Sequence, residues 1–235
     1  MELHVGTSGF SYKEWKGTFY PDDLPAGEML HYYGERLGSV EINSTFYRMP
    51  KPSVLETWSG QVPATFRFSI KASMKITHRK RLEDAGEETG YLVETVRALG
   101  SRLGVLLFQL PPNLKEDAAR LEAFLEILPP DIPTAFEFRH PSWGNDRVHT
   151  LLHAHGAALC QADTEEAPLE APLVATAPFG YLRLRRPDYD EGALSRWAER
   201  IRSQPWDRAF VFFKHEDEGA GPRMARTFLE TAGRG

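Results

Sequence analysis

The stretch SVEINSTFYRMP, from Ser39 to Pro50, carries the pattern that decides the fold. Its apolar residues alternate with Glu41 and Asn43, which is the period of a buried strand whose successive side chains point to opposite faces. On a strand of a closed barrel, Glu41 and Asn43 would both point towards the barrel axis. An aromatic and polar loop follows, and Pro50 prevents a simple continuation of the strand.

The same pattern recurs from Phe136 to His140, where Glu137 and Arg139 share a face and Pro141 ends the run. Parallel strands of a barrel end at one rim, so matched strand ends bring their side chains together. Two strand ends that each bear a carboxylate therefore indicate one site built by several strands.

The composition is that of an ordinary globular protein, with 235 residues and 41% hydrophobic content. Cys160 is the only cysteine and lies in an apolar run, which predicts a buried, unreactive thiol. The first ten residues have neither a basic segment nor a long apolar stretch, and no window approaches the roughly 18 apolar residues of a membrane span. We therefore expect a cytoplasmic protein with no membrane partner.

The net charge of −5 argues against a protein that covers its surface with cations to bind duplex nucleic acid. Acidic residues fall mainly in the stretches expected to be helices, whereas the basic residues concentrate in two places. These are the segment from Lys71 to Arg81 and the group Arg183, Arg185 and Arg186. The distribution predicts an acidic exterior around a basic opening that attracts an anion.

Eight short apolar stretches are expected to be strands, and helical spacing of apolar residues is expected between them. The strands are Glu2–Gly6, Val40–Ile42, Phe66–Ile70, Leu103–Leu110, Thr134–Phe138, Gly156–Asp163, Gly180–Leu184 and Ala209–Phe213. The helices are Leu24–Leu37, Val54–Ser59, Glu87–Leu99, Leu114–Leu128, Ser142–Ala154, Glu191–Ser203 and Pro222–Thr231, with Glu165–Pro178 weakly helical. Ser142 is the expected N-cap of its helix, and Pro222 suits a first helical position.

This alternation, at about 29 residues per unit, predicts a parallel sheet and fits a single (β/α)8 TIM-like barrel over residues 1–235. An open, doubly wound sheet would show the same alternation. No repeat or linker divides the chain, so we expect one domain.

The active site of such a barrel lies at the carboxyl ends of its strands, which supply the candidate residues. These ends bear polar or charged residues in chain order: Thr7, Ser8, Glu41, Asn43, Lys71, Gln109, Glu137, Arg139, Asp163, Arg183, Arg185, Lys214, His215 and Glu216. The alternative is a buried ion network that only supports the scaffold, since Lys71 could neutralise Glu41.

Glu41 and Glu137 are the candidate catalytic acid and base, with burial and nearby cations moving their pKa values apart. Retaining glycosidases on this fold usually carry their carboxylates on the fourth and seventh strands, where this chain has Gln109 and Arg183, so that reaction is disfavoured. Lys71 is the third catalytic candidate. A role as charge partner or anion clamp is favoured for it over a Schiff base.

The candidate substrate-binding residues are polar or aromatic groups around the same opening: Thr7, Ser8, Tyr12, Trp15, Asn43, Gln109, Arg139, His140, Asp163, Arg183 and Lys214. Arg183 and Lys214 follow strands where barrels frequently hold phosphate, and the turn 219–222 could present backbone N–H groups at a helix start. The aromatic side chains would suit a base or a sugar ring, or would simply cap the core.

No cofactor is indicated, although a divalent metal is possible. His78, His140 and His215, together with the carboxylates at the strand ends, offer nitrogen and oxygen ligands. None of them falls in a tight ligand-spacing motif. The oligomeric state is left open.

Several motifs, in order along nearly the whole chain, resemble those of the DUF72 (YecE-like) family. They are Gly6-Thr7-Ser8-Gly9 with Tyr12 and Trp15, Phe19-Tyr20-Pro21, Val40 to Tyr47, Phe68-Ser69 before Lys71, Thr77-His78, Gln109-Leu110-Pro111-Pro112, Glu137 to His140 with Ser142-Trp143, and Tyr181 to Leu184. The resemblance implies a TIM-like barrel and no established reaction. Many members have histidine and glycine at Arg185-Arg186 and an asparagine pair at Lys214-His215, so the mouth of this barrel is expected to be more basic.

These observations lead to a hydrolase or lyase that acts on a small anionic, phosphorylated or sugar-like substrate. Glu41 and Glu137 would be acid and base, Lys71 and Arg139 would stabilise developing negative charge, and Arg183 with Lys214 would hold the anion. The first alternative is a protein that binds single-stranded nucleic acid or cleaves phosphodiesters. The second is a non-catalytic barrel that binds a ligand.

Overall fold

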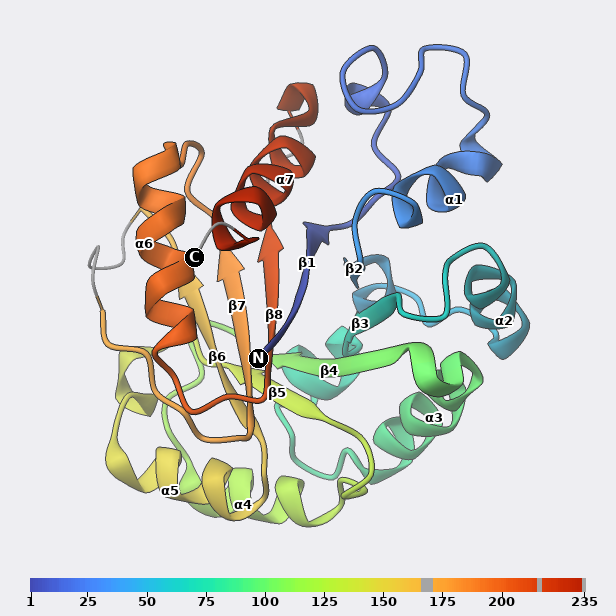
Figure 1. Cartoon of the computed structure of the whole chain (residues 1–235). Coiled ribbons are helices and arrows are strands. Elements are labelled where there is room, and N and C mark those ends of the chain that lie inside the picture. The colour runs from blue at the N-terminus through green and yellow to red at the C-terminus, as the bar shows by residue number, and fades with distance from the viewer. Residues whose placement is uncertain (166–170, 215–216, 234–235) are drawn as a thin grey trace.

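The chain forms a closed barrel of eight parallel strands in sequential order, β1 to β8 (Figure 1). The structure is a computed structural model that describes residues 1–165, 171–214 and 217–233. The strands are β1 (Glu2–Ser8), β2 (Ser39–Ile42), β3 (Arg67–Lys71), β4 (Leu103–Gln109), β5 (Thr134–Glu137), β6 (Ala158–Asp163), β7 (Phe179–Leu184) and β8 (Arg208–Phe213). The predicted TIM-like barrel is therefore confirmed, and the open-sheet alternative is wrong.

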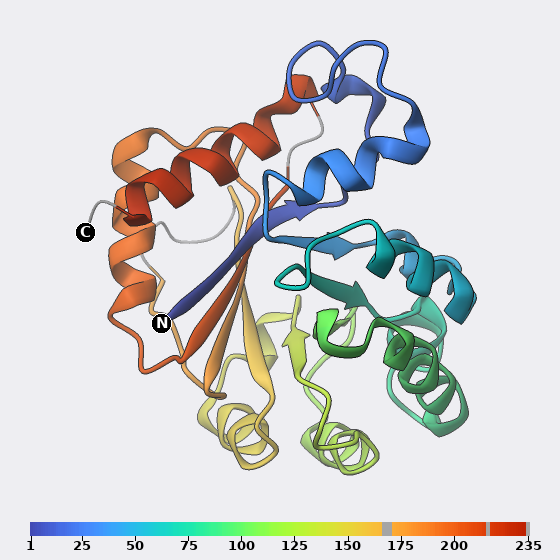
Figure 2. The ribbon, with the colours of Figure 1, turned by 45° about the vertical axis from the view of Figure 1, so that its right-hand side comes forward.

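Helices surround this barrel on its outside (Figures 1 and 2). They are α1 (Met29–Gly34), α2 (Pro52–Gly60), α3 (Gly86–Val96), α4 (Ala118–Glu126), α5 (Asp146–Ala154), α6 (Glu191–Arg202) and α7 (Ala220–Gly233). In both views α1, α2 and α3 lie to one side of the barrel, and α6 and α7 lie to the other. None of the helices in the described ranges is both long and apolar enough to cross a membrane.

Most predicted helices are present but shorter than expected. The helix predicted over Leu24–Leu37 is a 3₁₀ turn at Ala26–Glu28 followed by α1, because Pro25 holds an extended conformation just before the turn. Pro222 lies in the first turn of α7 rather than at its first position.

Two further local predictions are wrong. The N-cap of α5 is Asn145, whose side chain accepts a hydrogen bond from the Val148 N–H, while Ser142 lies in a separate 3₁₀ turn. Residues 171–178 form no helix, and the prolines there supply no backbone donors. Residues 166–170 of that predicted segment lie outside the described part of the chain.

The strand register decides which side chains meet inside the barrel. Glu41 pairs with Ser69, Gln109 pairs with Glu137, and Arg183 pairs with Ala162 and Phe212. Residues paired across neighbouring parallel strands point to the same side of the sheet. The acidic and amide side chains of β2, β4 and β5 therefore converge on one interior with Arg183.

The interior of the barrel beneath these polar side chains is apolar and buried. Its buried cluster includes Val105, Leu107, Tyr181, Phe210 and Phe212. A second, larger cluster fills the space between the outer face of the strands and the helices. This packing fixes the strands, so that the polar side chains at their carboxyl ends are held in place at the mouth.

The first and last strands close the barrel. Residues Glu2 to Thr7 of β1 pair in order with Arg208 to Phe213 of β8. On its other edge β1 pairs with β2. The first and the last strand thus lie side by side in one closed sheet.

Candidate functional site at the barrel mouth

Glu41 of β2 is fully buried and accepts hydrogen bonds from four side chains. Its Oε1 accepts hydrogen bonds from Ser8 Oγ at 2.8 Å, from Asn43 Nδ2 at 3.0 Å and from Arg183 Nη2 at 2.9 Å. Its Oε2 receives the Tyr181 hydroxyl at 2.8 Å. The donors come from β1, from the end of β2 and from β7, so this carboxylate joins opposite sides of the barrel.

Glu137 of β5 is held in the same way. Its Oε1 accepts from Gln109 Nε2 at 2.7 Å, and its Oε2 accepts from Arg183 Nη1 at 2.6 Å. Arg185 Nη1 lies 3.9 Å from Oε1. The thiol of Cys160, buried as predicted, lies 3.9 Å from Oε2.

Arg183 bridges the two carboxylates and is only 3% exposed. Burial alone would raise the pKa of Glu41 and of Glu137, but the Arg183 guanidinium and the hydrogen-bond donors outweigh it, so both pKa values lie below the usual value. Both groups are therefore carboxylates at neutral pH. The expectation that their pKa values move apart into an acid and a base is not supported by this geometry.

The position of Arg183 also bears on the predicted anion clamp. Two of its nitrogens are bound to carboxylates, and its Nε is buried without a hydrogen-bond partner. A guanidinium enclosed in this way favours the role of holding Glu41 and Glu137 over that of contacting a ligand. The scaffold-ion-network interpretation thus applies to Arg183, rather than to the predicted Lys71–Glu41 pair.

Lys71, at the end of β3, has a different environment. Its Nζ donates to Gln109 Oε1 at 2.8 Å and lies 4.2 Å from the centre of the Phe46 ring. Burial, followed by the charge of Arg183, lowers the pKa of Lys71 to about 8, although Glu41 and Glu137 act in the opposite direction. Part of the Lys71 population is thus uncharged at neutral pH, because a pKa of about 8 lies close to pH 7.

Further cationic and aromatic side chains form the rim. Arg139 is exposed, whereas Lys214 and His140 are partly exposed, and His140 Nδ1 lies 2.9 Å from Ser142 Oγ. His78 packs edge-on against Phe46 with ring centres 4.9 Å apart. Burial and the neighbouring Lys71 lower the pKa of His78, which keeps this imidazole neutral at pH 7.

Four predicted substrate-binding residues lie elsewhere. The Thr7 side chain contacts the Tyr33 hydroxyl of α1 at 2.9 Å, and Trp15 is buried in the core. The ring of Tyr12 packs on Trp15, with ring centres 4.8 Å apart, and its hydroxyl donates to the Ser8 carbonyl at 2.7 Å. Asp163 pairs with Leu184 in the sheet and so points outwards.

Asp163 takes part in a second polar cluster, outside the barrel. Its carboxylate accepts from Arg186 Nε at 2.7 Å and from the Tyr189 hydroxyl at 2.7 Å. These residues line a cavity of about 930 Å³ that also includes Trp197 and Arg200 of α6. The mouth and this cavity lie on opposite sides of the sheet at the ends of β6 and β7.

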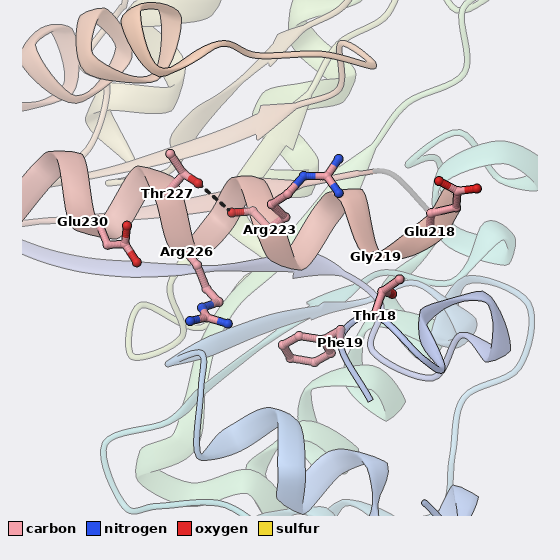
Figure 3. Close-up of a pocket in the computed structure, with 8 residues that line it drawn as sticks. All are labelled: Thr18, Phe19, Glu218, Gly219, Arg223, Arg226, Thr227 and Glu230. Atoms are coloured by element: carbon pink, nitrogen blue, oxygen red, sulfur yellow. Dashed lines mark hydrogen bonds between the residues drawn. The ribbon is translucent and has the colours of Figure 1, made fainter. Parts of the chain in front are cut away.

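The turn before α7 contributes to another cavity, of about 270 Å³ (Figure 3). Gly219 lines it together with Thr18, Phe19 and the exposed Arg223 and Arg226. Arg183 does not line this cavity, so the predicted joint use of that turn and Arg183 for one phosphate has no geometric support. His215 and Glu216 lie outside the described residues.

Sequence reasoning gave Tyr181 no role at the mouth, predicted His78 only as a possible metal ligand, and did not predict the contact of Phe46 with Lys71. Tyr181 lies two residues before Arg183 on the same strand, so alternation alone could have placed it on the same face. Phe46 and His78 come from loops, and their approach to Lys71 depends on loop conformation that no periodic pattern encodes.

The donor set does not favour a metal. Among the described residues, no three His, Cys, Asp or Glu side chains come together as metal ligands. The oxygen atoms of Glu41 and Glu137 that face the interior are taken up by Arg183 and by amide and hydroxyl donors. The function proposed for this site therefore assigns no role to a divalent metal.

A family profile and two curated proteins are similar to this chain over much of its length. The sequence profile of the family described as "Protein of unknown function DUF72" matches residues 4–235. The UPF0759 protein YecE of Escherichia coli strain K12 is 30% identical over 97% of this chain and 92% of its own length. The UPF0759 protein YunF of Bacillus subtilis is 31% identical over 60% of this chain, and that match spans about half of YunF, 52% of its length.

A solved structure supports the same assignment. The crystal structure of a DUF72 family protein from Thermotoga maritima is similar to this chain, with a TM-score of 0.86 and 27% identity. The match covers 98% of both chains. The profile, the full-length relative and the shared barrel agree, and the chain belongs to the DUF72 family.

Proposed function

We propose that this protein is an enzyme of the hydrolase or lyase type that acts on a small anionic, phosphorylated or sugar-like substrate at the barrel mouth. The observation that carries the proposal is an excess of cations around two carboxylates that are already satisfied. Arg183 neutralises part of the charge of Glu41 and Glu137. Lys71 and Arg139 remain, and neither forms an ion pair with a carboxylate of the described residues, whereas Arg185 Nη1 lies 3.9 Å from Glu137 Oε1.

The cations at the mouth lower one another's pKa values, as expected where positive charges outnumber carboxylates. Burial and then Arg183 lower the pKa of Arg185, and Arg139 acts in the same direction. Burial and then Arg183 likewise lower the pKa of Lys71. An anion bound between Lys71, Arg139 and Arg185 would relieve this repulsion, so the mouth favours a negatively charged ligand.

The chemistry would then fall to Lys71 and the neutral His78, while Glu41 and Glu137 stay ionised and position the surrounding groups. A group whose pKa is close to the working pH transfers protons most effectively. Arg139 and Arg185 would stabilise negative charge that develops on the substrate.

The test is a thermal-shift and calorimetric titration with inorganic phosphate and with sugar phosphates. A ligand at 100 times its dissociation constant should stabilise the protein by about 2.7 kcal/mol. We expect binding in the parent protein and in Arg202→Gln, an exposed position at the carboxyl end of α6, and weaker binding in Arg139→Gln and Arg185→Gln. Equal binding by all four proteins, or no binding by any, would contradict the proposal.

A second candidate function, binding of single-stranded nucleic acid with or without phosphodiester cleavage, is favoured by one observation. Tyr47 is 77% exposed and lies edge-on against Phe46, in the loop that meets the basic segment from Lys71 to Arg81. Exposed rings beside cations can stack on bases. Affinity for oligonucleotides that falls steeply with salt, and that is lost in Tyr47→Ala, would support this function instead.

A further inference from the structure

The polar partner of the half-buried Lys71 is an amide rather than a carboxylate. Its Nζ donates to Gln109 Oε1, and no carboxylate of the described residues lies within ion-pair distance of it. The carboxylates that could have paired with it, on Glu41 and Glu137, are bound by Arg183. The amine is therefore placed at the mouth without a fixed counter-charge.

The charged groups that face Lys71 come from several strands. Arg183 of β7 and Arg185, just after that strand, disfavour its protonated form, and Glu41 of β2 and Glu137 of β5 favour it. Burial adds to the effect of the arginines, and the pKa of Lys71 falls to about 8. At pH 7 roughly a tenth of the side chain is then uncharged, which is on the order of 100-fold more than for an ordinary lysine.

An uncharged amine held among cations, beside an aromatic ring, is the arrangement that makes lysine a nucleophile. Phe46 covers one side of the amine at 4.2 Å, and Gln109 holds it at 2.8 Å. Arg139 and Arg185 lie at the same opening and suit a carboxylate or phosphate group. A ligand held there by its anionic group would bring an adjacent carbon to the amine.

We infer that Lys71 forms an imine with the carbonyl carbon of a small anionic aldehyde or ketone. This inference rests on the proposed function and narrows it from hydrolase or lyase to a lyase that works through a covalent intermediate.

The step balances without an oxidant or a cofactor. The Lys71 ammonium gives one proton to a base, for which the neutral His78 on the same rim is suited, and the amine adds to the carbonyl carbon. The carbonyl oxygen becomes a hydroxyl group, takes up the proton and leaves as water, so that a protonated imine remains. When the carbon β to the imine bears a hydroxyl group, that hydroxyl gives its proton to His78 and the bond between the α and β carbons breaks. The β carbon departs as an aldehyde or ketone, and the electron pair of the broken bond remains on the α carbon as an enamine. Protonation of the enamine and addition of water then release the product and the free amine.

The experiment is reductive trapping followed by peptide mapping. The protein is treated at pH 7 with pyruvate, glyoxylate or glyceraldehyde 3-phosphate and with cyanoborohydride, and separately with formaldehyde as the smallest carbonyl probe. Trapping adds the mass of the carbonyl compound less one oxygen. We expect Lys71 to be labelled at least about 10-fold faster than the exposed Lys75, and inorganic phosphate to slow the labelling of Lys71 alone.

Lys71→Arg keeps the charge and removes the nucleophile, so it is the matched control. It should lose the trapped adduct while still binding phosphate in the titration above. Lys71 labelling no faster than Lys75 with every probe, in a protein that binds phosphate at the mouth, would overturn the imine and leave the anion site intact. Failure to bind phosphate would instead overturn the proposed function itself.

Discussion

Two arginine–carboxylate clusters lie at the ends of β6 and β7, one inside the barrel and one outside it. Inside, Arg183 bridges Glu41 and Glu137 and is almost completely buried. Outside, Arg186 pairs with Asp163, and the side chain of Arg186 is 16% exposed. The inner cluster gathers residues from five strands, β1, β2, β4, β5 and β7, whereas the outer one joins the end of β6 to Arg186 and Tyr189 in the loop after β7. Of these two arginines, only Arg183 links strands that are not neighbours in the barrel, namely β7 with β2 and β5.

The largest expected effect is on the inner cluster. Arg183→Met leaves two buried carboxylates without their cation, and we expect it to lower the free energy of unfolding by about 3–5 kcal/mol. Urea unfolding at pH 7 measures this. A loss below about 1 kcal/mol would mean that the two clusters are equivalent and that the bridge does not hold the barrel.

The same variant should respond to acid in the opposite sense to the parent protein. In the parent, the pKa values of Glu41 and Glu137 are lower in the folded state than in the unfolded state, so their ionised forms add stability above about pH 4.3 that is lost as the pH falls through the folded values. Without Arg183, burial raises these folded pKa values, and protonation relieves the buried charge. The difference between the two proteins should therefore shrink by about 2 kcal/mol between pH 7 and pH 4, and a constant difference would refute this electrostatic account.

Lys71→Met is expected to stabilise the protein, by about 2 kcal/mol at pH 7. The pKa of Lys71 is about 8 in the folded state, below its unfolded value, so keeping it charged costs stability at neutral pH. This cost falls as the pH rises from about 8 to about 10.4, and the gain in Lys71→Met should fall with it. Melting temperatures at pH 7 and pH 10 test this, with Lys75→Met as the exposed control. Equal destabilisation of both variants at both pH values would contradict it.

The smallest expected effect is on the outer cluster. Arg186→Met should lower the free energy of unfolding by about 1–2 kcal/mol, because Asp163 keeps the Tyr189 hydroxyl as a donor and lines a cavity rather than the packed interior of the barrel. Ligand binding at the mouth should be unchanged. A loss as large as that of Arg183→Met, measured in the same urea titration, would remove the distinction between the clusters.

Much of the fold and part of the site follow from the sequence. Period-two alternation places Glu41, Gln109, Glu137 and Arg183 at strand ends, and the register brings them together inside the barrel. The sequence predicts Thr7 and Asp163 at the same strand ends, but their side chains lie on the outer face of the barrel rather than in the mouth. Neighbouring residues on a strand point to opposite sides. Assigning the face needs the register with the neighbouring strand, which a single strand does not reveal.

The partners of each charge were harder to predict. Nothing in the local sequence distinguishes Arg183 from Arg185, yet one is enclosed by two carboxylates and the other lies partly open at the rim. Which cation neutralises Glu41 depends on distances across the barrel. Burial and then the charge of Arg183 lower the pKa of Lys71, because Arg183 rather than Lys71 pairs with the carboxylates.

The pairing of β1 with β8 has a consequence for synthesis of the chain on the ribosome. β1 cannot complete its hydrogen bonds until the strand from Arg208 to Phe213 has emerged. Until then the Glu2–Ser8 strand has one edge without its final neighbour, and a contact between segments far apart in a sequence forms slowly. We expect barrel closure to be a late event in folding, and the nascent chain to depend on protection of that edge until β8 has been made.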